Sequence, residues 1–144
     1  KHEFEDLSQS VITLKQSSSP TQTQMIQIQE KDLFVQVQEK GKKTLSIQLN
    51  HDQGLTLLLK DQETGIVQEV KLNGKTITQT CRNKEKTSTY EQKPDSITVT
   101  CDHFTVQAEN ITLKAQDSVE ISGTSKVDIE TPVTNLKCPC VKMG

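Results

Sequence analysis

Hydrophobic and polar residues alternate along the first half of the chain. Residues 25–29 read Met-Ile-Gln-Ile-Gln, and residues 33–38 read Leu-Phe-Val-Gln-Val-Gln. The same alternation continues at Leu45, Ile47, Leu49, Leu55, Leu57 and Leu59. Since successive side chains of a strand point to opposite faces, a period of two predicts half-buried β-strands. No segment has the three- and four-residue apolar spacing of a helix, so we expect almost no helix.

Polar segments separate these strands. Clusters of Gly, Asn, Asp and Lys predict turns at 39–43, 50–54, 61–65 and 73–74. Residues 16–24 consist of Gln, Ser, Thr and Pro and predict a polar linker, and residues 82–95 contain no aliphatic residue and predict a second linker or a long loop. We therefore divide the chain into an N-terminal segment that is partly linker (1–24), a β-rich base (25–80), a loop or linker (81–95), a repeat region (96–137) and a C-terminal tip (138–144).

The repeat region consists of apolar pairs separated by one polar residue. The first members of the pairs are spaced by 7, 7, 8 and 8 residues. The pairs are Ile97/Val99, Phe104/Val106, Ile111/Leu113, Val119/Ile121 and Val127/Ile129. A three-residue strand and a short corner, repeated, are typical of the rungs of a β-helix or β-prism.

One such rung cannot form a core within a single chain. Eight residues span about 25 Å when extended, which is too short to wind around a packed core. Two buried side chains per rung are also too few to compensate for the entropy of ordering its backbone. We therefore expect an all-β homotrimer, an intertwined β-helix (β-prism) needle with a smaller N-terminal β region, in which the ten residues of the pairs form the core on the three-fold axis.

Composition supports a thin β-structure rather than a conventional globular domain. Hydrophobic residues make up 31% of the chain, and Gln, Thr and Ser supply 45 of 144 residues. Low hydrophobicity is also typical of disordered chains, but the regular alternation argues against disorder. The net charge of −2 argues against nucleic-acid binding, and the longest near-continuous apolar run, 55–59, is too short to cross a bilayer.

Candidate catalytic chemistry is sparse. Cys101 and His103 would share one face of a strand, with Asp102 on the other, which could suggest a nucleophile and its base. Nothing in the sequence supplies a lowered thiol pKa or an oxyanion site, so we interpret the three residues as a corner at a strand end. Asp128 and Glu130 are interpreted as solvating charges that also block edge-to-edge pairing. We expect no enzymatic activity.

The C-terminal tip offers one candidate metal site. Three copies of Cys138 and Cys140 would converge around the axis of a parallel trimer and could bind Zn²⁺ or an Fe–S cluster. They could instead form disulfides between chains, or simply close the core, with Pro139 stopping further strand pairing. We expect no other cofactor.

Two segments carry a family resemblance. Residues 45–78 resemble strands that lead into a spike, and residues 97–136, with Ile-Thr-Leu-Lys-Ala and Val-Glu-Ile-Ser-Gly, resemble the spike itself. The family is the VgrG-like central spike of type VI secretion systems and contractile phage tails. The resemblance implies a membrane-puncturing needle that sits on a hexameric tube and baseplate at its N-terminal side and carries a PAAR-like tip protein at its C-terminal side. Typical members have a tube-adaptor domain and an OB-fold before the needle, so we expect the adaptor to be absent or a separate chain.

The resemblance also implies assembly in the bacterial cytoplasm, followed by secretion or injection into a target cell and transient contact with the target membrane. A trimeric phage or surface fibre that binds a receptor or glycan is the alternative, and it predicts exposed aromatic side chains for sugar stacking. A polysaccharide-degrading β-helix would need a groove with clustered acids or bases, which short strands leave little room for.

Overall fold

The computed structural model describes residues 12–135 and 137. Nine strands account for its regular structure. Their bounds are β1 (Ile12–Ser19), β2 (Gln22–Gln29), β3 (Asp32–Glu39), β4 (Lys43–Asn50), β5 (Gly54–Asp61), β6 (Val67–Leu72), β7 (Ile77–Arg82), β8 (Thr87–Lys93) and β9 (Ser96–Thr100).

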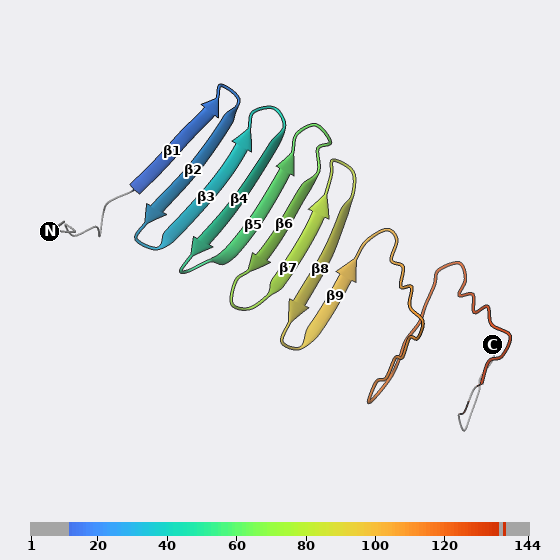
Figure 1. The fold of residues 1–144 in the computed structure, drawn as a ribbon. Helices are drawn as coiled ribbons and strands as arrows, with labels where there is room; N and C mark the ends of the chain where they lie inside the picture. The colour runs from blue at the N-terminus through green and yellow to red at the C-terminus, as the bar shows by residue number, and fades with distance from the viewer. Residues whose placement is uncertain (1–11, 136, 138–144) are drawn as a thin grey trace. The chain divides into compact units, whose positions relative to one another are not determined.

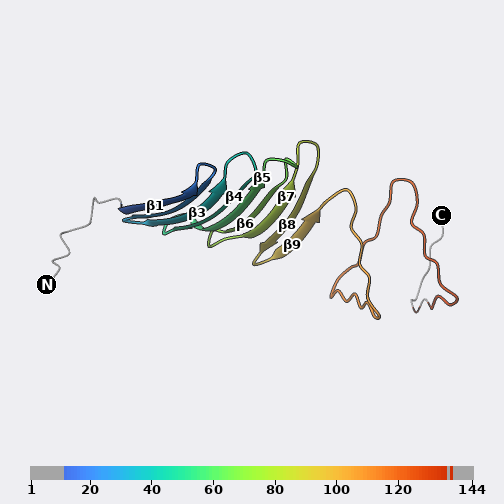
Figure 2. The same cartoon turned by 45° about the horizontal axis from the view of Figure 1, so that its top comes forward.

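The nine strands form one antiparallel sheet in chain order, so each strand pairs with the strand before it and the strand after it (Figure 1). Figure 2 shows the same succession of strands from a second direction. The described residues contain no helix, which confirms the all-β prediction. Short connections between neighbouring strands explain this order, because two to five residues suffice for an antiparallel hairpin and not for a crossover.

The turns form where the sequence predicts them. Their residues lie between β3 and β4, β4 and β5, β5 and β6, and β6 and β7. Several turns begin with a side-chain oxygen that accepts backbone N–H groups two and three residues further on, which replaces strand pairing at the bend. The residues that do this are Asn50, Asp61, Asn73 and Asn83.

Two predicted linkers are largely wrong. Residues 16–19 belong to β1 and residues 22–24 belong to β2, while residues 87–93 form β8 between β7 and β9. These strands have few aliphatic residues, but their neighbours supply backbone hydrogen-bond partners on the paired sides. Thr is also compatible with a pleated strand because it is β-branched. Residues 96–100, predicted to begin the repeat, form the last strand of the sheet.

The chain divides into two units, Lys1–Thr105 and Val106–Gly144. No strand is assigned between Cys101 and Asn135, so the three-residue strands predicted after Val99 are not formed within the single chain. A strand requires a paired neighbour, and every pairing in the described part of the chain joins two of β1–β9. The trimeric β-helix therefore remains a prediction.

One layer of sheet does not make a core. No hydrophobic side chain is buried among the residues with described side chains, and Thr44 is the one buried residue, at 8% exposure. Globular domains bury the apolar side of a sheet against a second layer. In the described part of this chain, the sheet has no such second layer.

Candidate functional site: the apolar face of the sheet

The strand register gathers apolar side chains on one side of the sheet. Residues directly opposite each other in neighbouring strands share a face, as do alternate residues within a strand. One row runs Ile26, Val35, Ile47, Leu57 and Val70 across five strands. The flanking rows run Ile28, Leu33, Leu49, Leu55, Leu72 and Ile77, and Val37, Leu45 and Leu59. We call the side that carries these three rows the apolar face.

The opposite side, which we call the polar face, carries mostly Thr, Gln, Ser and Lys. In β4, for example, Thr44, Ser46 and Gln48 alternate with Leu45, Ile47 and Leu49. Gln48 donates from Nε2 to both carboxylate oxygens of Asp32 at 3.2 Å across the β3–β4 pair. The two faces therefore differ in chemistry along the whole central part of the sheet.

No described residue covers the apolar face. Val37 is 48% exposed, Leu45 47% and Ile47 45%, and the other members of the rows in β2–β7 are half-buried or exposed. Contiguous exposed apolar surface of this kind marks an interaction site on a soluble protein. The hydrophobic effect strongly favours covering such a face, because each fully buried aliphatic side chain contributes about 1.5–3 kcal/mol.

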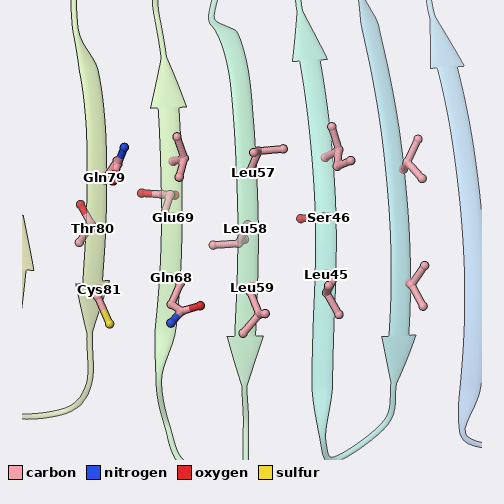
Figure 3. A pocket seen from close by; sticks show the side chains of 14 residues that line it. Leu45, Ser46, Leu57, Leu58, Leu59, Gln68, Glu69, Gln79, Thr80 and Cys81 are labelled. Atoms are coloured by element: carbon pink, nitrogen blue, oxygen red, sulfur yellow. The ribbon is translucent and has the colours of Figure 1, made fainter. Parts of the chain in front are cut away.

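The centre of the apolar face is hollowed. The hollow has a volume of about 650 Å³, and side chains from β3 to β7 line it (Figure 3). Its apolar lining includes Val35, Ile47, Leu57 and Val70, while Gln68, Gln79 and Cys81 lie toward one end. A concave apolar surface with a few polar groups can receive complementary side chains or an apolar ligand.

Charged residues lie at the rim of this face and not within its three rows. Lys43 and Asp61 pair across β4 and β5 with an Nζ–Oδ2 distance of 3.7 Å. Backbone N–H groups of Thr64 and Glu63 donate to the Asp61 carboxylate and hold its pKa below the usual value, with Lys43 adding to this effect. Glu39 accepts a hydrogen bond from the Lys42 ammonium at 2.8 Å, which raises the pKa of Lys42. An apolar centre with a charged rim is the usual anatomy of a protein interface.

The structure places the predicted core residues in two settings. Ile97 and Val99 lie in β9 on the apolar face, opposite Gln92 and Tyr90, and are 64% and 45% exposed. The remaining eight lie after β9 and are at least 50% exposed. They are Phe104, Val106, Ile111, Leu113, Val119, Ile121, Val127 and Ile129. Their role as a trimer core stays a prediction.

The rows in β2–β7 were missed as candidate core residues. Their alternation is evident in the sequence, and it correctly predicts the strands. Alternation alone does not show whether another element covers the apolar face, because that depends on where the other elements pack. The structure supplies this information for the described residues.

Among the described residues, the side chains of Cys101, Asp102 and His103 make no hydrogen bond or ion pair with one another. The Cys101 thiol donates to the backbone carbonyl of His103 at 3.3 Å, and the Asp102 carboxylate pairs with Lys86 at 2.8 Å. Asp128 pairs with its neighbour Lys126, as expected for a solvating charge. This geometry agrees with the interpretation of residues 101–103 as a strand end.

The candidate metal site at Cys138 and Cys140 lies outside the described residues. Within the described part, no group of three or more His, Cys, Asp or Glu side chains could hold a metal ion. Cys81 and Cys101 are free thiols.

No described helix is long and apolar enough to cross a membrane.

Comparisons with known proteins identify no relative, since no protein-family model, curated protein or solved structure matches this chain.

Proposed function

We propose that this protein is a non-enzymatic homotrimeric spike of a contractile injection apparatus of the type VI secretion class. The observation that carries the proposal is the uncovered apolar face of β2–β7. A sheet with this face exposed to water would aggregate unless a partner covered it, and three copies of the chain can cover one another around a common axis.

The repeat after β9 supports the same assembly. Its apolar pairs recur every seven or eight residues, and its backbone has no strand pairing within the described chain. Other copies of the chain would supply both the missing strand partners and the apolar cover. Because every rung would then pair with its neighbours, the product would be a stiff rod whose surface carries Thr, Gln, Glu, Asp and Lys.

The mechanism of such a spike is mechanical. Contraction of a sheath drives the rod through a target membrane, and no side chain performs chemistry. In this proposal the N-terminal side contacts the hexameric tube and baseplate, and the C-terminal tip contacts a PAAR-like protein, with Cys138 and Cys140 as axial metal ligands or core plugs. The protein is assembled in the bacterial cytoplasm and leaves the cell when the apparatus fires.

The alternative, a fibre that binds a receptor or glycan, has less support. Sugar binding favours exposed aromatic rings. Among the aromatic residues with described side chains, Phe34 and Tyr90 are half-buried and Phe104 is exposed at 69%. A single exposed ring within an apolar repeat is poor support for a sugar-binding surface.

The first experiment is the absolute mass in solution, measured by light scattering with and without strong detergent. We expect three times 16.1 kDa and resistance to dissociation. A folded monomer would overturn the trimeric spike.

The second experiment tests the apparatus rather than the trimer. Chemical cross-linking in contracted and uncontracted sheath preparations should link the chain to the tube protein, and its release from cells should require an intact sheath. A trimer that is released independently of the sheath would favour the fibre.

A further inference from the structure

The apolar face is interrupted by polar residues in β6, β7 and β8. All nine positions of the three rows in β3, β4 and β5 are apolar. Beyond them, the register places five polar side chains on the same face: Gln68, Gln79, Cys81, Ser88 and Gln92. We call these five residues the polar belt. The apolar character returns in β9 with Ile97 and Val99.

The polar belt is a cluster in space, although its members are spread between residues 68 and 92 of the sequence. Gln68 lies opposite Cys81, which lies opposite Ser88, so three members form one continuous row. Gln79 lies opposite Tyr90 in the adjacent row, and the Tyr90 hydroxyl donates to Oε1 of Gln92 at 3.4 Å. All five members are exposed, so whatever covers the apolar face must also cover them.

Covering this belt with apolar groups is unfavourable. A buried amide or hydroxyl without a hydrogen-bond partner costs about 1–3 kcal/mol. The belt side chains are uncharged, and the Gln amides both donate and accept, so amides of the same kind are suitable partners. A suitable cover is therefore apolar, then polar, then apolar, with the same spacing.

A second copy of the chain has this pattern. In a closed symmetric assembly, equivalent residues lie at the same level along the axis. The belt of one copy then faces the belts of the others, and apolar rows face apolar rows. A copy displaced by one strand, about 4.8 Å, would bring Gln79 toward the level of Val70 in its neighbour.

We propose that the polar belt fixes the register in which copies of this chain associate through their apolar faces. The proposal rests on the trimer of the proposed function and adds the determinant of its alignment. Uniform aliphatic rows would allow neighbouring copies to slide by whole strands at little cost. Polar groups buried in such a surface select one register at some expense of stability, because the other registers leave them unpaired.

The test replaces three glutamines of the polar belt with aliphatic residues and measures the number of registers in which the copies associate. The variant carries Gln68→Leu, Gln79→Val and Gln92→Leu. The matched control carries Thr78→Val, Thr80→Val and Glu91→Leu, which add comparable apolar groups to β7 and β8 on the polar face. Both are compared with the unsubstituted chain by light scattering and by NMR of labelled isoleucine methyl groups.

We expect one methyl signal for each isoleucine in the unsubstituted trimer and in the control, because all three copies are then equivalent. In the belt variant, Ile77 should give at least about two methyl signals. Trimers in which one copy is shifted by one strand then become similar in free energy to the aligned trimer. Its thermal midpoint should stay the same or rise.

The outcomes separate the two proposals. A monomeric unsubstituted chain overturns both the trimer and the belt's role in it. A trimeric belt variant with a single signal for Ile77 overturns only the register role. If the triple variant does not fold, Gln79→Val alone is measured by the same criterion, and an unsplit Ile77 signal in that folded trimer also overturns the role of the belt.

Discussion

Ile47 in β4 lies directly opposite Leu57 in β5, and the two side chains remain 45% and 38% exposed. Direct cross-strand aliphatic partners at the centre of a nine-stranded sheet would normally be buried under a second layer. Their exposure is the observation from which we propose that this sheet forms part of an interface.

Leu57→Asp should prevent assembly. It places a carboxylate in the hollow of the apolar face, and we expect the trimer to be destabilised by at least about 3 kcal/mol because a charge would be buried without a partner. Thr56→Asp is the matched control, since Thr56 is the preceding residue and faces the polar side. Light scattering measures the mass, and far-UV circular dichroism checks that strands persist. If the trimers of both variants dissociated to the same extent, the assignment of Leu57 to the apolar face would be contradicted.

Ile121→Asp should abolish trimer formation through the repeat. In the proposed assembly, three carboxylates would meet on the axis, where like charges in a low dielectric repel strongly. Ser122→Asp introduces the same charge one position later, at a polar corner, and should leave the mass unchanged. A normal, fully stable trimer of the Ile121 variant would show that this residue does not point inward.

Gly54→Ala should destabilise the sheet more than Gly41→Ala. Both glycines have positive φ, 91° and 78°, which costs an alanine about 1–2 kcal/mol. A Cβ at Gly54 would also overlap the backbone carbonyl oxygen of Leu72 in β6, whereas a Cβ at Gly41 meets no atom within 4 Å. Denaturant unfolding should therefore show a loss greater than about 2 kcal/mol for Gly54→Ala and a smaller one for Gly41→Ala. Equal losses would mean that β6 does not approach the start of β5 in this way.

Asp61 should make stability depend on pH in the acidic range. Its pKa is lowered from 3.8 in the folded chain because backbone N–H groups of Thr64 and Glu63 donate to the carboxylate. A group with a depressed folded pKa contributes stability above its unfolded pKa, and this contribution is lost as the pH falls through the folded value. The thermal midpoint of the unsubstituted chain should therefore decrease when the pH is lowered below about 4.

Asp61→Asn is the control for this effect. The amide oxygen can still accept the two backbone hydrogen bonds, but the side chain does not titrate. Below about pH 4, the thermal midpoint should decrease less steeply with falling pH in the variant than in the unsubstituted chain. Parallel pH profiles would show that other carboxylates control acid unfolding.

Much of the sheet could be predicted from the sequence. The strands around Ile47 and Leu57 follow from strict alternation, and the turns at 39–43 and 73–74 follow from residues that tolerate positive φ or form side-chain turns. The strands β1 and β8 could not be predicted in the same way. Their side chains are mostly polar, and they are strands because neighbouring strands supply the hydrogen bonds.

The candidate interface was less accessible to sequence reasoning. The pairs from Ile97 to Ile129 attract attention because they repeat at a fixed period. The larger apolar surface lies earlier, in β2–β7, where hairpin register aligns residues that are far apart in the sequence. The polar belt is visible only after this alignment, because Gln79 and Gln92 appear in the sequence as ordinary members of polar segments.

The sequence by itself determined the all-β class, the central strands and most of their turns, because these depend on side-chain alternation and on local backbone preferences. Only the tertiary structure decided that the nine strands form one consecutive sheet, that its described residues leave the apolar face uncovered, and that five polar side chains interrupt that face. These properties depend on which strands are neighbours and in what register. A shift of one residue in any hairpin would reverse the two faces of the strands beyond it.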